Sequence, residues 1–97
     1  MPVKTRAWDA AETLDTPERI ARYLEAAFED GDPALIAAAI GDAARAHGMS
    51  DLARETGLAR EALYRALSET GNPEFATVLK VLGALGLKLA AVAETTR

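Results

Sequence analysis

The chain has 97 residues, enough for one domain with one modest hydrophobic core. The absence of cysteine excludes disulfides, cysteine-ligated metal sites and thiol nucleophiles, and no apolar run is long enough to predict a membrane-spanning helix. Acidic residues outnumber basic ones 15 to 11, and the excess lies in residues 1–48, which suits a basic protein partner without excluding DNA, because DNA binding needs only a locally basic face.

Residues 1–15 show no helical period and are predicted to form an N-terminal arm, extended or as a short strand. They lack the apolar stretch of a signal peptide, so we expect a cytoplasmic protein. Trp8 in this arm is a candidate anchor for a partner protein, because Trp is enriched at binding hot spots. The alternative is that Trp8 packs its own arm onto the core.

Residues 16–97 are predicted to form a single all-α domain of five helices, because alanine is abundant and aromatic residues are few. Asp15-Thr16-Pro17 and Asp32-Pro33 are helix starts, each with a capping residue and an early proline. The first helix is expected to end at Gly31 and the second near His47-Gly48. Their apolar stripes comprise Ile20, Tyr23, Leu24, Ala27 and Phe28 in the first helix and Leu35, Ile36, Ala39, Ile40 and Ala43 in the second.

Ser50 is predicted to cap a third helix that stops at Gly57, and a fourth helix is expected from about residue 60 to residue 68. Asn72, in Gly71-Asn72-Pro73-Glu74, is predicted to cap a fifth helix, which Gly86 ends. The fifth apolar stripe comprises Phe75, Val78, Leu79, Leu82 and Leu85.

After Gly86, Leu87, Leu89 and Ala91 alternate with Lys88, which predicts a short C-terminal strand; a frayed tail is the alternative. A lone strand cannot satisfy its backbone groups. It would pair with the N-terminal arm or with the same strand of a second subunit, so the pattern hints at a homodimer.

Residues 50–68 combine three features of a helix-turn-helix. A small residue, Ala53, lies where two helices would cross, and Gly57, four positions later, tolerates a left-handed backbone in the turn. Apolar residues then lock the two helices together. The alternative is an ordinary helical hairpin. The predicted packing residues are Leu52, Ala53, Gly57, Leu58, Leu63 and Leu67, with Ala66 beside them.

The outward face of the fourth helix is predicted to contact DNA. Arg60 can pair bidentately with guanine, and Glu61 can accept from cytosine. Tyr64 can touch a thymine methyl group or a phosphate, and Arg65 a phosphate or guanine. Ala59 completes the face, and the helix starts at Ser50 and Asn72 can hold phosphates on free N–H groups. The alternative is a solvated face with an ion pair between Glu61 and Arg65.

The sequence offers little for catalysis. His47 is the single histidine, with no second histidine or cysteine to complete a metal site and no Ser–His–Asp arrangement around it. It is predicted to be a helix-end residue. We therefore expect no metal, no cofactor and no enzymatic activity.

The segments YLEAA, GDP, GMSDLARETGLAREALYRALS, GNPEF and VLGALGLKL together resemble the addiction-module antidote proteins, which are HigA-like antitoxins with a helix-turn-helix of the phage-repressor class. The resemblance runs from about Trp8 to Leu89. It implies a five-helix repressor-like fold, a dimer that binds its own operator as a repressor, and neutralisation of a small basic RelE/ParE-like toxin, commonly a ribonuclease that cleaves mRNA.

The resemblance places the recognition residues on Ala59, Arg60, Glu61, Tyr64 and Arg65. Ala59 departs from the small hydroxyl residue often seen there, which puts the details of base reading in doubt. The acidic first half with its Trp8 arm could cover the toxin, whereas the C-terminal strand could serve the toxin or the dimer. Two other functions stay open: a phage-type repressor without a toxin, and a helical protein-interaction domain that does not bind DNA.

Overall fold

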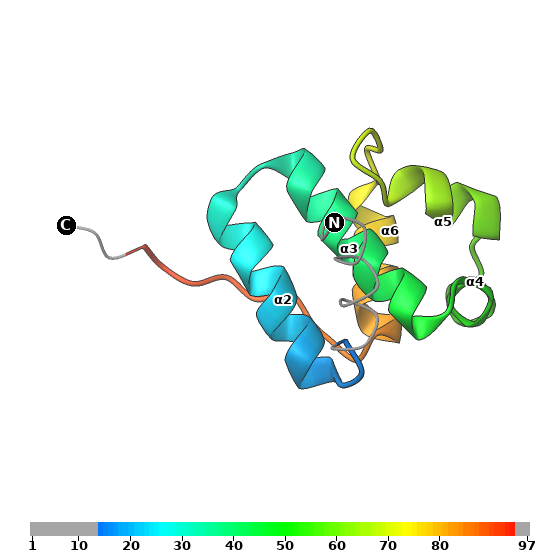
Figure 1. Cartoon of the computed structure of the whole chain (residues 1–97), viewed down its shortest axis with the longest axis horizontal. Coiled ribbons are helices and arrows are strands. Elements are labelled where there is room, and N and C mark those ends of the chain that lie inside the picture. The colour runs from blue at the N-terminus through cyan, green and yellow to red at the C-terminus, as the bar shows by residue number, and fades with distance from the viewer. Residues whose placement is uncertain (1–13, 95–97) are drawn as a thin grey trace, which may run out of the picture.

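The computed structural model describes residues 14–94, and these residues form five α-helices and no β-strand (Figure 1). The all-helical class expected from the sequence is confirmed for them. α2 and α3 form a helical hairpin, α6 lies behind α3, and α4 and α5 stand at the end of the molecule away from α2. The helices are α2 (Pro17–Asp30), α3 (Pro33–His47), α4 (Met49–Thr56), α5 (Arg60–Ala66) and α6 (Phe75–Ala84).

The hairpin of α2 and α3 begins and turns where the sequence predicts. The backbone N–H of Arg19 donates to Thr16 Oγ1 at 3.2 Å, and that of Ala34 donates to Asp32 Oδ1 at 3.1 Å. Both caps satisfy an N–H group that has no partner inside its helix. Gly31 ends α2 with a left-handed backbone, φ 82°. A connection of two residues is therefore enough to reverse the chain.

One hydrophobic core joins the five helices, and its largest fully buried side chains are Leu24, Ile40, Leu52, Leu63, Leu67 and Val81. Four members of the predicted apolar stripes lie outside it: Phe28, Leu35, Phe75 and Leu79 are 40%, 39%, 66% and 43% exposed. α2 and α6 each bury only a narrow sector, which comprises Ile20, Leu24 and Ala27 in α2 and Val81 and Leu82 in α6. The stripes in the sequence are wider than these sectors, so their edges remain exposed.

Gly41 is the point where α3 passes the chain that follows α5. It is buried, and a methyl group added to it would overlap the backbone carbonyl oxygen of Leu67. Only glycine lets these two backbones approach so closely. The contact sets how near the end of α5 can lie to the α2–α3 hairpin.

The end of α6 is a Schellman motif at Gly86, as the glycine there predicts. Gly86 has φ 84°, its N–H donates to the Gly83 carbonyl at 3.0 Å, and the Leu87 N–H donates to the Leu82 carbonyl at 2.8 Å. Beyond Leu87 the backbone forms no hydrogen bond within residues 14–94.

The expected C-terminal strand is therefore wrong for the single chain. Residues 87–94 run beside α2 and past it (Figure 1), and no second extended segment in the described part of the chain is aligned to pair with them. Within residues 14–94 no helix has the length and apolar character needed to cross a membrane.

Candidate nucleic-acid interface

The connection between α4 and α5 is three residues long, and its shape is fixed by Thr56 and Gly57. Gly57 is left-handed, φ 76°, and its N–H donates to the Ala53 carbonyl at 2.9 Å. The Thr56 hydroxyl donates to the Leu52 carbonyl at 2.7 Å and accepts from the Leu58 N–H at 3.3 Å. Sequence reasoning found Gly57 and missed Thr56, although Thr and Ser commonly bond to nearby backbone groups at such turns.

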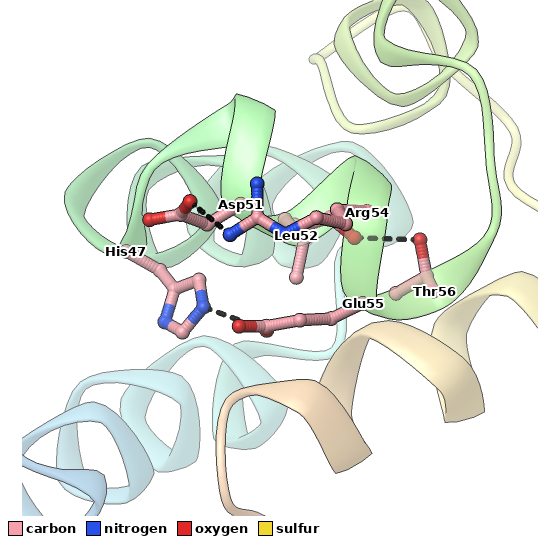
Figure 2. A network of polar contacts seen from close by, with 6 residues as sticks. All are labelled: His47, Asp51, Leu52, Arg54, Glu55 and Thr56. Atoms are coloured by element: carbon pink, nitrogen blue, oxygen red, sulfur yellow. Dashed lines mark hydrogen bonds and ion pairs between the residues drawn. The ribbon is translucent and has the colours of Figure 1, made fainter.

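The junction between α3 and α4 is held by a contact between side chains (Figure 2). Nε2 of His47, the last residue of α3, lies 2.9 Å from Oε1 of Glu55 on α4. His47 is thus the helix-end residue that the sequence predicts. Asp51 and Arg54 pair across one turn of α4, at 2.6 Å. Both of their side chains are more than half exposed, so this pair contributes little stability.

The predicted packing residues of α4 and α5 lie at the contact between these two helices and the core. Leu52, Leu63 and Leu67 are fully or almost fully buried, whereas Ala53 and Leu58 are partly buried and pack against the core. Leu67 lies just after α5, which ends at Ala66. With these residues turned inward, the opposite side of α5 faces solvent.

The structure brings the five predicted recognition residues together on that exposed side: Ala59, Arg60, Glu61, Tyr64 and Arg65. The guanidinium carbon of Arg60 lies 5.7 Å from the centroid of the Tyr64 ring, within cation–π range. Within residues 14–94 neither Arg60 nor Arg65 forms an ion pair, so the alternative pair between Glu61 and Arg65 is not formed. The two guanidinium groups remain available to an anion.

Ser50 does not cap α4, contrary to the sequence prediction. The N-cap is Gly48, and Ser50 is the exposed second residue of the helix. Gly48, with φ 109° and ψ 113°, both ends α3 and begins α4. α4 therefore starts earlier than a capping role for Ser50 would predict.

Asn72 does not cap α6 either, because α6 starts at Phe75 with Glu74 as its N-cap. Gly71 lies directly against the carbonyl groups of Arg65 and Ala66, so residues 71–74 serve to close the connection from α5. Asn72 instead shares a surface hollow of about 360 Å³ with Arg65, between α5 and the start of α6.

Helices α4, α5 and α6 all begin without a side-chain cap, in contrast to α2 and α3. Their N-caps are Gly48, Ala59 and Glu74. At none of these positions does a side chain accept a hydrogen bond from a backbone N–H of the helix. The first N–H groups of an uncapped helix are free to bind water or an anion. This half of the molecule therefore combines unpaired guanidinium groups with free backbone donors.

Two other sequence expectations concern sites of a different kind. Trp8, the candidate partner anchor, lies outside the described residues. Within residues 14–94 no group of three or more His, Asp and Glu side chains is arranged to hold a metal ion.

Comparisons with known proteins identify a family and a relative. The model of the family described as probable addiction module antidote protein matches residues 4–93. A Haemophilus influenzae protein described as uncharacterized is 48% identical over 88 residues, which are 91% of each chain. No solved structure matches the chain significantly. The family match therefore spans all five helices and almost the whole segment after α6.

Proposed function

Because the chain belongs to the family of probable addiction module antidote proteins, we propose that it is an antitoxin that neutralises a toxin protein and also represses its own operon. The family match over residues 4–93 carries this proposal, since an antidote implies a toxin partner. The resemblance to HigA-like antitoxins adds that the toxin is small, basic and RelE/ParE-like. On this proposal the protein is a cytoplasmic binding protein and has no catalytic role.

The DNA-binding part of the proposal is supported by the exposed side of α5. Helices α4 and α5 act as a helix-turn-helix, and α5 enters the major groove with Arg60, Tyr64 and Arg65 directed at bases and phosphates. The contact between Arg60 and the Tyr64 ring holds a long side chain near one position, so less side-chain entropy is lost when it binds DNA.

Phosphate binding is supported by the uncapped helix starts. The free N–H groups at the beginning of α4 and α6 can each hold a phosphate oxygen, beside Ser50 in the first case and close to Asn72 in the second. Asn72 lies in the same hollow as Arg65, so one phosphate could contact both side chains.

A homodimer is supported by the exposed apolar side of α6. Phe75 and Leu79 lie one turn apart on this helix and are 66% and 43% exposed, so a second copy packed there would cover both. A dimer also doubles the number of Arg60 and Arg65 side chains that face DNA. This local doubling offsets the acidic balance of the whole chain.

Fluorescence anisotropy with DNA from upstream of the gene tests the recognition helix. We expect Arg60→Ala and Arg65→Ala each to weaken binding by about 1–3 kcal/mol without unfolding the protein, because both side chains are exposed. Arg22→Ala, also at an exposed arginine but on α2, is the matched control and should bind like the wild type. Equal affinity of the double variant and the wild type would overturn the assignment.

Co-expression with the product of the adjacent reading frame tests the antitoxin role. The neighbour alone is tagged, and this chain should co-purify with it in a fixed ratio and restore growth when the neighbour is toxic. If DNA binding is found without any complex, the chain is a repressor without a toxin. If neither is found, a helical protein-interaction domain is the better account, and the acidic balance would then favour a basic protein as its partner.

A further inference from the structure

A groove of about 600 Å³ lies between α2 and the extended segment that follows α6. One wall is the side of α2 that carries Glu25, Phe28 and Glu29, and the other wall is formed by residues 87–94. Figure 1 shows this segment crossing α2 and continuing beyond it, on the side of the molecule away from α5. The groove is thus separate from the surface proposed to bind DNA.

The groove is lined by apolar side chains that the protein leaves in water. Phe28, Leu89 and Val92 are 40%, 43% and 88% exposed, and all three line the groove. Burying a large apolar side chain contributes about 1.5–3 kcal/mol, so leaving three of them exposed is a loss for the isolated chain. Exposed apolar side chains gathered in one groove are typical of a binding surface.

The charged residues of the groove are mostly acidic. Glu25, Glu29 and Glu94 line it together with a single cation, Lys88. Within residues 14–94 none of these four groups forms an ion pair. An apolar groove with unpaired carboxylates is complementary to a segment that carries an apolar side chain between Lys or Arg residues.

The wall formed by residues 87–94 also offers backbone hydrogen-bonding groups. No backbone hydrogen bond within residues 14–94 involves residues 88–94, so their N–H and C=O groups can pair with an extended segment of another protein. Such pairing would give these residues the partner strand that they lack in the single chain.

We propose that this groove is where the basic toxin docks, with an apolar side chain between Phe28 and Val92 and with cations on Glu25, Glu29 and Glu94. This inference rests on the proposed antitoxin function and names the surface that performs it. A second copy of the chain fits less well, because the groove carries three carboxylates and one cation, so two such grooves in contact would repel each other. DNA fits still less, since its phosphates would be repelled.

The test uses the full chain and the purified product of the adjacent reading frame, with the dissociation constant measured for matched variants. Leu89→Asp places a charge in the groove, and Leu35→Asp places one at a leucine of similar exposure on α3, outside the groove. We expect Leu89→Asp to weaken binding about tenfold or more and Leu35→Asp to change it less than about twofold. Melting temperatures should be unchanged, since both side chains are well exposed.

A second pair of variants tests the charges. Glu25→Lys with Glu29→Lys should weaken toxin binding and make the dissociation constant less sensitive to salt, because two attractive contacts are reversed. Glu18→Lys with Glu69→Lys makes the same change of net charge outside the groove and should leave toxin binding close to that of the wild type. Hydrogen exchange of the residue 88–94 amides should slow in the wild-type complex.

The outcomes separate this inference from the function on which it rests. If the wild type does not bind the neighbouring protein, the antitoxin function itself is overturned. If the wild type binds and the groove variants bind equally well, only the assignment of the surface is overturned. If Leu89→Asp turns a dimer into a monomer in light scattering and leaves toxin binding unchanged, the groove is an interface between copies, which also overturns the inference.

Discussion

The close approach of Gly41 to the chain after α5 leads to a prediction that can be worked out from the structure. In Gly41→Ala, the added methyl group overlaps the carbonyl oxygen of Leu67, which cannot move aside as a flexible side chain would. Replacing glycine by alanine inside a helix contributes about 0.8–1 kcal/mol of stability. Overpacking of a core costs about 1–3 kcal/mol, and more when backbone must shift.

We expect the second effect to win, so that the free energy of unfolding of Gly41→Ala falls by about 1–2 kcal/mol. For a domain of this size each kcal/mol lowers the melting temperature by about 4–8 °C. Urea unfolding followed by far-UV circular dichroism measures the change.

The matched control is Gly83→Ala, which makes the same substitution within α6. Gly83 is exposed and its added methyl group meets open space, so only the helix propensity changes and the protein should gain about 0.8–1 kcal/mol. The reasoning is refuted if Gly41→Ala is as stable as the wild type, because the two backbones would then not be in contact.

Substitutions at three further positions probe other elements of the fold. Gly57→Ala should lower the unfolding free energy by about 1–2 kcal/mol although space is open around it, because its left-handed backbone disfavours a side chain; an unchanged urea midpoint would contradict this conformation. Ala53→Leu should overpack the contact between α4 and α5 and lower the free energy of unfolding by about 1–3 kcal/mol. An unchanged melting temperature would mean that the helices do not pack there. Thr16→Ala should remove the cap of α2 and lower the free energy of unfolding by about 1 kcal/mol. Thr16→Ser should retain the cap and the stability of the wild type, and urea titrations measure both variants.

The helix positions could be predicted where one residue type acts through local geometry. Thr16 and Asp32 cap their helices because a short polar side chain reaches the next turn, whatever surrounds it. Gly31 and Gly86 end helices because they adopt a left-handed backbone without strain. These signals depend only on a few neighbouring residues, so the sequence alone contains them.

Helix starts that depend on the tertiary structure could not be predicted in this way. Ser50 and Asn72 have good capping side chains, but the chain reaches α4 through Gly48 and reaches α6 through a connection that Gly71 packs onto α5. Gly41 gave no signal at all, because a glycine within a predicted helix does not reveal which backbone lies against it.

Of the two candidate surfaces, one could be predicted from the sequence and the other depends on the tertiary structure. The exposed side of α5 follows from helical periodicity, since Leu63 turned inward leaves Arg60 and Tyr64 outward. The groove beside α2 required the structure, because Glu25 and Glu94 are far apart in the sequence and their proximity depends on the path of the chain after Gly86. Phe28 illustrates the limit: its spacing places it on the apolar side of α2, but not at the exposed edge of that side.

The central position of α3 has a thermodynamic consequence. One side of this helix packs on α2, which forms a wall of the groove, and at Gly41 it contacts the backbone just after α5. If toxin bound in the groove changes the affinity for operator DNA by some factor, the operator must change the affinity for toxin by the same factor, because the binding free energies around a closed cycle sum to zero. Titrating the toxin with and without operator DNA would therefore also determine whether rising toxin levels tighten or release repression.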